Sequence, residues 1–104
     1  MESRLFSVDN TPPASTMRLE NIERGRVRIA IEAVDQTSTL NQAEVSVDTG
    51  DWQPVFPEDG IIDSKSESFT WLSSELPGGE HVVAFRIYDQ NDNAGLAKLI
   101  VRIP

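Results

Sequence analysis

The chain has 104 residues, with 17 acidic and 9 basic side chains, one histidine and no cysteine. A formal net charge of −8 excludes the basic surface that nucleic acids and anionic membranes require, and the absence of cysteine excludes disulfides and thiolate metal sites. This length suits one domain with a single core, and no apolar run approaches the roughly 20 residues that span a bilayer.

Two successive prolines, Pro12 and Pro13, mark the first boundary in the chain. Each holds φ at about −65° and lacks a backbone donor, so this stretch cannot join a helix or a central strand. The pair predicts a stiff, polyproline-like lead-in to whatever follows. We therefore expect residues 1–13 to be a linker and residues 14–104 to form one domain.

The residues before this lead-in contain no basic segment followed by a long apolar run, so they predict no signal peptide. If the protein works outside the cell, its export signal is expected to lie elsewhere in a longer polypeptide. Met1 is accordingly expected to begin an excised segment. Leu5 and Phe6 are expected to pack across the joint with a preceding domain.

Strand-like alternation begins directly after the prolines. Residues 15–20 predict a first strand with Met17 and Leu19 facing inward. Residues 26–34 show the clearest pattern, because apolar side chains occupy every second position. Residues 42–48 repeat this alternation and predict a third strand.

A hairpin follows the third strand, whose outward face is expected to include Ser46. Residues 48–51 predict a tight turn in which Gly50 is free to adopt a positive φ. Residues 52–55 predict a short return strand. Pro54 restricts that strand to an edge of the sheet, because proline cannot donate to a neighbouring strand.

The second half of the chain begins with a long stretch, residues 57–66, that lacks clear alternation. It predicts a crossing loop that buries Ile61 or Ile62. Alternation then returns in three segments, at residues 67–72, 80–89 and 97–103. The segment 80–89 is expected to be a central strand, because apolar residues occur on both of its faces.

About seven short strands, with turn signals roughly every ten residues and no helical period, predict an all-β fold. The expected architecture is an antiparallel β-sandwich of two sheets. Its predicted core is formed by Val27, Ile29, Ile31, Val45, Val47, Phe69, Val83, Phe85, Ile87, Leu99 and Val101.

Four parts of the sequence resemble bacterial immunoglobulin-like domains, which are similar in shape to fibronectin type III domains. They are the lead-in at residues 8–13, the hairpin at 43–52, the strand at 76–89 and the turn at 89–95. The resemblance implies an immunoglobulin-like β-sandwich that belongs to a larger, exported, multidomain bacterial protein. It implies no particular activity, because this architecture carries many unrelated functions.

Two residues depart from the pattern of that group. His81 stands where such domains often place a tyrosine whose hydroxyl bonds back to the chain, and one ring nitrogen could make a similar bond. Asp92 stands where glycine is usual. An aspartate there implies a left-handed or bridge backbone conformation, which aspartate tolerates.

The string Asp-Gln-Asn-Asp-Asn at residues 89–93 resembles the calcium-binding string of cadherins. Carboxylate and amide oxygens suit Ca²⁺, which makes Asp89, Asp92 and Asn93 the candidate metal ligands. The alternative is a turn in which Asp89 and Asn93 bond local backbone donors. We favour the turn, because a full strand still follows this string, and we expect no cofactor.

Trp52 and Trp71 are the candidate ligand-binding residues, since two exposed indoles could stack on sugar rings. Aromatic side chains are more often buried, however, and Trp71 is expected to join the core beside Phe69. Trp52 follows a turn and suits either environment. A carbohydrate- or calcium-binding module is therefore the alternative function.

No pattern in the chain predicts catalysis. His81 is the only histidine and lies in a predicted strand, and no Gly-x-Ser-x-Gly motif is present. The expected function is that of a non-catalytic accessory module that spaces, orients or docks neighbouring domains of the same polypeptide. The expected location is extracellular or periplasmic, and another protein or a carbohydrate is a further possible partner.

Overall fold

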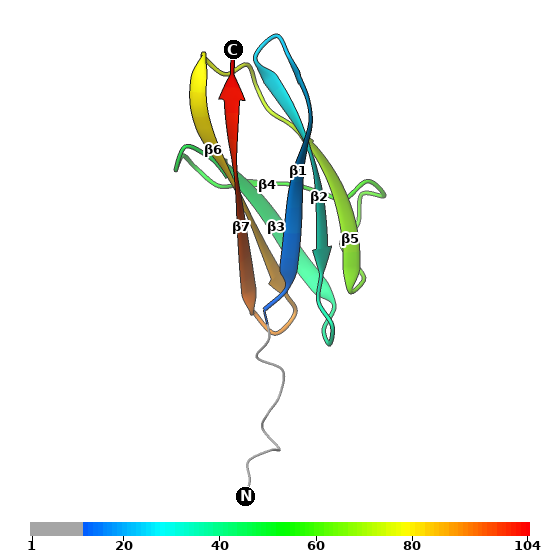
Figure 1. The fold of residues 1–104 in the computed structure, drawn as a ribbon. Coiled ribbons are helices and arrows are strands. Elements are labelled where there is room, and N and C mark those ends of the chain that lie inside the picture. Colours follow the sequence, from blue (N-terminus) through cyan, green and yellow to red (C-terminus); the bar gives the residue numbers. More distant parts are fainter. Residues whose placement is uncertain (1–11) are drawn as a thin grey trace, which may run out of the picture.

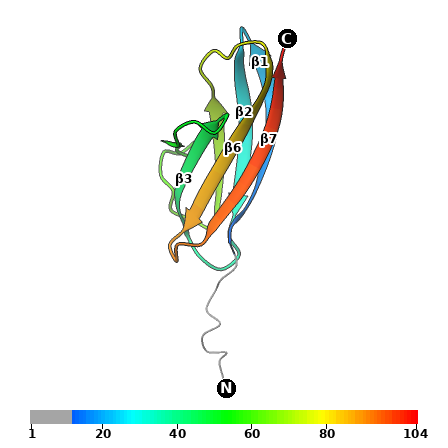
Figure 2. The same ribbon diagram turned by 90° about the vertical axis from the view of Figure 1, so that its left-hand side faces the viewer.

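The computed structural model describes residues 12–104, which form two antiparallel sheets packed face to face (Figures 1 and 2). One sheet has the strand order β1 (Ala14–Glu23), β2 (Arg26–Val34), β5 (Ser66–Leu72). The other has the order β4 (Gln53–Pro54), β3 (Leu40–Val47), β6 (Gly79–Asp89), β7 (Ala94–Ile103). The predicted all-β sandwich of seven strands is confirmed. The residues expected to pack against a preceding domain, Leu5 and Phe6, lie outside the described residues, as does most of the lead-in.

The core lies where the inward faces of β2, β5 and β6 meet. Phe69 of one sheet meets Phe85 of the other edge to face, with ring centroids 5.2 Å apart. Both rings are fully buried. The buried core residues are Val27, Ile29, Ile31, Ala33, Leu40, Ala43, Val45, Val55, Phe69, Val83, Phe85, Ile87, Val101 and Ile103.

The predicted core is largely confirmed, with two members less buried than expected. Leu99 is half-buried and packs against the core, and Val47 is half-buried beside a cavity described below. Leu40 and Val55 are buried although they were not expected in the core. Both lie at the ends of strand segments, where alternation is weakest as a guide.

Leu19 faces inward as expected, yet the residue remains 39% exposed. Leu19 pairs with Ile29 and so lies on the inward face. However, β1 is an edge strand, and its pairing with β2 is interrupted between Leu19 and Asn21. The side chain therefore lies at the margin of the sandwich.

Ser46 faces outward as expected, yet only 3% of the residue is exposed. Ser46 does lie on the outer face of β3, where it pairs with Ala84. The β3–β4 turn folds back over it, and its hydroxyl donates to the carbonyl of Gly50 at 2.8 Å. This hydrogen bond satisfies a polar group that the turn buries.

The β3–β4 turn occurs one residue earlier than the sequence suggests. Asp48 and Thr49 carry the positive φ angles, 53° and 59°, and Gly50 does not. The amide of Gly50 donates to the carbonyl of Val47 at 2.9 Å and closes the turn. Two positive φ angles at the centre match a type I′ turn, whose twist suits a hairpin. Asp92 adopts the left-handed conformation expected of it, with φ 63°.

The long loop before β5 crosses from one sheet to the other, as expected. Ile62 packs against the core, whereas Ile61 is exposed. β4 pairs with β3 through Gln53 and Pro54 alone and forms an edge of its sheet. The sandwich is therefore closed on the side where β1 lies beside β7 and less completely covered beside β4 (Figure 1).

The lead-in is held against the sheet at one point. The backbone of Pro13, which is buried, crosses directly over Gly95 at the start of β7. A Cβ atom at Gly95 would overlap the carbonyl oxygen of Pro13. Only glycine permits so close an approach of two backbones.

We predict that Gly95→Ala lowers the free energy of unfolding by about 2–3 kcal/mol, because the added methyl group must displace the Pro13 backbone. Urea unfolding followed by circular dichroism measures the change. Gly78→Ala is the matched control, because its Cβ would meet its nearest neighbour at an ordinary 3.5 Å. Equal stabilities of the two variants would contradict the steric role of Gly95.

Candidate functional site

The outer face of the four-stranded sheet carries a row of exposed apolar side chains. Val82 of β6 lies directly opposite Ile100 of β7, and Leu96 lies four residues before Ile100 on the same face. Their exposed fractions are 37%, 64% and 59%, respectively. We call these three residues the outer apolar stripe. Lys98 lies between its two β7 members on the same face.

Trp52 packs at the margin of this stripe. The guanidinium of Arg86 lies 4.0 Å from the centre of the Trp52 ring system and 5.5 Å from that of Tyr88. Arg86 is oriented by Glu44, whose Oε1 accepts from its Nη2 at 2.6 Å and from its Nε at 3.1 Å. A cavity of about 300 Å³ opens between Trp52 and the stripe.

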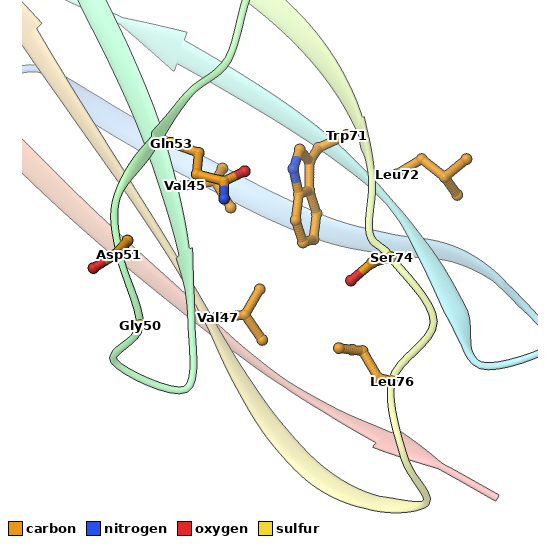
Figure 3. Close-up of a pocket in the computed structure, with 9 residues that line it drawn as sticks. All are labelled: Val45, Val47, Gly50, Asp51, Gln53, Trp71, Leu72, Ser74 and Leu76. Carbon is orange, nitrogen blue, oxygen red and sulfur yellow. The ribbon is translucent and has the colours of Figure 1, made fainter.

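Trp71 lines a different cavity, of about 340 Å³, between the two sheets (Figure 3). It pairs with Ile29 and therefore lies on the inward face of β5, where it packs against the core and remains half-buried. Val45 and Val47 of β3 line the opposite wall. The β3–β4 hairpin separates Trp71 from Trp52, so the two indoles line different cavities and form no shared platform.

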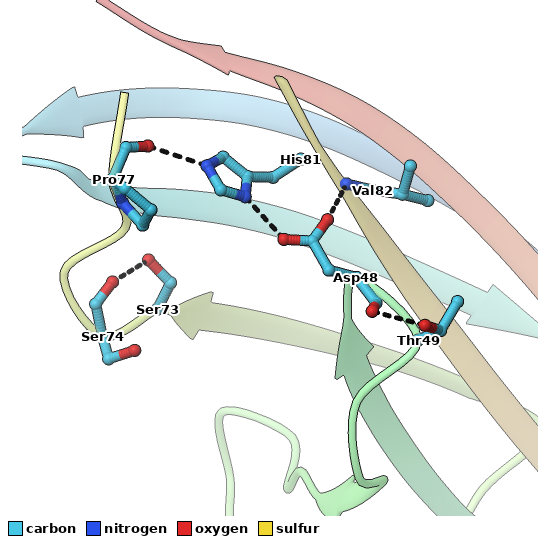
Figure 4. A network of polar contacts seen from close by, with 7 residues as sticks. All are labelled: Asp48, Thr49, Ser73, Ser74, Pro77, His81 and Val82. Carbon is cyan, nitrogen blue, oxygen red and sulfur yellow. Dashed lines mark hydrogen bonds and ion pairs between the residues drawn. The ribbon is translucent and has the colours of Figure 1, made fainter. Parts of the chain in front are cut away.

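His81 lies near the start of β6 and links the β3–β4 turn to the loop that precedes β6 (Figure 4). Its Nδ1 lies 2.6 Å from Oδ2 of Asp48, and its Nε2 lies 2.7 Å from the carbonyl oxygen of Pro77. The second contact confirms that the histidine bonds back to the chain in the way expected for a tyrosine there. The other carboxylate oxygen of Asp48 accepts from the amide of Val82 at 2.9 Å.

This geometry sets the protonation of the ring. A carbonyl oxygen and an ionised carboxylate only accept, so both ring nitrogens must donate, as they do in the imidazolium form. The hydrogen bond to Asp48, and next that to Pro77, raise the pKa of His81 above its ordinary 6.5. The hydrogen bonds from His81 and from the amide of Val82 lower the pKa of Asp48 below its ordinary 3.8.

The candidate metal ligands lie in the β6–β7 turn. Oδ1 of Asp89 accepts from the amides of Asn91 and Asn93 at 2.8 and 3.0 Å, and its Oδ2 accepts from the Asn93 side chain at 3.1 Å. Asp89 is fully buried, whereas Asp92 is exposed. The structure therefore joins Asp89 and Asn93 directly. Among residues 12–104, no group of three or more His, Cys, Asp or Glu side chains is placed to hold a metal ion.

A second buried carboxyl group, that of Asp35, lies beside Asp89. Its Oδ1 accepts from the amides of Thr37 and Ser38, while its Oδ2 is buried without a donor among the described residues. Burial acts to raise the pKa of Asp89. Hydrogen bonds from Asn93 and Asn91 outweigh it and leave the pKa of Asp89 below its ordinary 3.8.

The sequence analysis gave no role to Asp48, the partner of His81, or to Asp35, the neighbour of Asp89. Asp48 and His81 are 33 positions apart, and Asp35 is separated from Asp89 by most of the domain. Only strand pairing brings them together. The one available signal was that Asp35 and Asp89 each directly follow a strong strand pattern and precede polar turn residues.

Solved structures with the same fold include three bacterial or archaeal modules. The PKD1 domain of Vibrio anguillarum Epp matches with a TM-score of 0.67 and 12% identity, over 91% of this chain and 96% of that one. The PKD domain of an M14-like peptidase from a Thermoplasmatales archaeon matches at 0.64 and 14%, over 89% and 93%. Fibronectin(III)-like modules of Clostridium thermocellum CbhA match at 0.54 and 15%, over 86% and 46%. No family model and no curated protein matches this sequence.

The chain has an immunoglobulin-like fold. The resemblance to immunoglobulin-like and fibronectin type III domains is thus confirmed for the fold, which is all that such low identities show. The described part of the chain consists of strands and loops, and it contains no helix long and apolar enough to cross a membrane.

We predict that stability falls as the pH rises through the raised pKa of His81. The folded pKa lies above the unfolded one, so this contribution is complete below about pH 6.5 and is lost above it. The lowered pKa of Asp48 adds a loss below about pH 3.8. Urea midpoints measured from pH 5 to pH 9 test the first loss.

His81→Gln is the control for this titration, because His81 is the only histidine in the chain. The variant should show no decline in its urea midpoint where the wild type declines. A wild-type midpoint that stays constant, or rises, between pH 6 and pH 9 would refute the imidazolium assignment.

We predict that Asp35→Asn raises the free energy of unfolding by about 1 kcal/mol. The amide oxygen can still accept from Thr37 and Ser38, while the new NH₂ group can donate to Asp89 and removes a buried acceptor without a donor. Asp89→Asn should instead lose about 2 kcal/mol, because its NH₂ group would face the donor group of Asn93. Destabilisation by both variants alike would contradict this account.

Proposed function

We propose that this chain is a non-catalytic module that docks against and orients neighbouring domains of a larger, exported polypeptide. The outer apolar stripe carries this proposal. On an exposed sheet face, alternation would place polar residues, yet Val82, Leu96 and Ile100 are apolar and open to solvent. Contiguous exposed apolar residues mark interaction surfaces.

The course of the chain supports an orienting role. Pro12 enters at one end of the sandwich, and β7 carries the chain out at the opposite end (Figure 1). Ten residues of β7 span roughly 34 Å at the usual rise per residue. Neighbouring domains on either side would be held at least that far apart. The close contact between Pro13 and Gly95 would limit the angles available at the entry.

The available side chains favour a non-catalytic role. Both ring nitrogens of the only histidine are engaged, with Asp48 and with the Pro77 carbonyl. The similar solved structures are themselves modules, one of which belongs to an M14-like peptidase. By analogy, this supports an extracellular or periplasmic setting in which a catalytic or binding domain occupies another part of the polypeptide.

The test uses this chain joined to the domains that flank it in its parent polypeptide. We predict that the double variant Leu96→Ser, Ile100→Ser frees the module, so that its rotational correlation time in ¹⁵N relaxation falls toward that of a single domain. Its melting temperature should stay within a few degrees of the wild type, because exposed positions contribute little to stability.

Leu72→Ser is the matched control, since Leu72 is an exposed leucine on the other sheet. The control should tumble jointly with its neighbours, as the wild type does. Joint tumbling that survives the double variant would refute docking through the outer apolar stripe.

A further inference from the structure

The cavity beside Trp71 exists because the two sheets are unequal at one edge. β5 is a full edge strand of seven residues, whereas β4 spans only two. The wall opposite Trp71 is therefore formed by Val45 and Val47 of β3 with only the short β4 beyond them, while the loop residues Ser74 and Leu76 continue the wall on the Trp71 side (Figure 3). A volume of about 340 Å³ lies in the range of small-ligand sites.

Gln53 is the unexpected residue of this cavity. It pairs with Val45 and so lies on the cavity side of β4, but it is exposed because β4 is a two-residue edge strand. Figure 3 shows its amide directed toward the indole of Trp71. A polar side chain at the mouth of a cavity can hydrogen-bond a ligand without the cost of burial in the core.

The polar groups around the cavity are open for a ligand. The Trp71 indole N–H, the Gln53 amide and the Ser74 hydroxyl have no hydrogen-bond partner among residues 12–104, and all three side chains line the same space. Together they offer donors and acceptors. Val47 and Leu76 face each other across an apolar floor (Figure 3).

We propose that this cavity binds one ring of a neutral sugar, with its apolar face against Trp71 and its hydroxyl groups bonded to Gln53 and Ser74. A pyranose ring has both features that the walls require, an apolar C–H face and a rim of hydroxyl groups that donate and accept. An aliphatic or aromatic side chain from a peptide would leave the amide and hydroxyl unpaired. Unpaired buried polar groups weaken such binding.

Charge decides between neutral and acidic sugars. Asp51 lies at the rim of the cavity, none of the residues that line it is basic, and the whole chain has a net charge of −8. A uronate or a sulfated sugar would meet repulsion with no compensating cation. The site is independent of the outer apolar stripe, which lies on the far side of the β3–β4 hairpin.

The test titrates the protein with neutral gluco-, xylo-, manno- and chito-oligosaccharides and, as the acidic comparison, oligogalacturonate. The indole N–H signals of Trp71 and Trp52 in ¹H–¹⁵N NMR spectra report on the two cavities separately. We expect at least one neutral oligosaccharide to shift the Trp71 signal saturably. The Trp52 signal should stay in place.

Gln53→Leu is the decisive variant. It should weaken binding about tenfold, the loss expected for a pair of ligand hydrogen bonds, while its apolar side chain keeps or raises the melting temperature. Trp52→Phe and the double variant Leu96→Ser, Ile100→Ser should bind like the wild type. Failure of domain docking would therefore leave this result untouched.

Three outcomes would overturn the sugar site. They are the absence of a saturable Trp71 shift with every neutral oligosaccharide, unchanged binding by Gln53→Leu, and tighter binding of oligogalacturonate than of any neutral probe.

Discussion

The edge-to-face contact between Phe69 and Phe85 is the interaction on which the rest of the molecule depends. It joins the two sheets at their centre, with ring centroids 5.2 Å apart and both rings fully buried. Two aromatic rings in this arrangement stabilise more than their buried area alone. Because Phe85 lies on the central strand β6, its inward direction also determines that Val82 and Arg86 lie on the outer face.

The two ends of the sandwich are closed by polar groups instead of apolar ones. At one end, His81 ties the β3–β4 turn to the loop before β6 through Asp48 and the Pro77 carbonyl. At the other, Asp89 organises its own turn beside Asp35, and the side chain of Asn91 donates to the Ser38 hydroxyl. The backbone N–H and C=O groups of these loops have no partner in a neighbouring strand, so buried side chains hydrogen-bond to them. At the His81 end, the hydrogen bonds to Asp48 and to Pro77 raise the pKa of the histidine above its ordinary 6.5.

The β3–β4 hairpin is short, yet it separates the two surfaces to which we assign functions. Its turn directs Trp52 outward over Arg86, whereas its two-residue return strand leaves Trp71 partly uncovered between the sheets. A longer β4 would cover the cavity beside Trp71. The shortness of β4 therefore accounts for the candidate sugar site. The apolar residues of β6 and β7 account for the docking face.

Period-two alternation determined the strands of this protein, most of its core and its sandwich fold, because alternation records locally which face each residue buries. The alternation predicted that Phe69 and Phe85 both face inward, but it did not predict that their rings are in contact. Tertiary structure alone decided which sheet each strand joins, that β1 leaves Leu19 at the margin, and that the β3–β4 turn covers Ser46. It also decided that His81 contacts Asp48 and that Trp52 and Trp71 line two different cavities. These features depend on residues brought together by strand pairing across long stretches of chain, and local periodicity carries no record of that pairing.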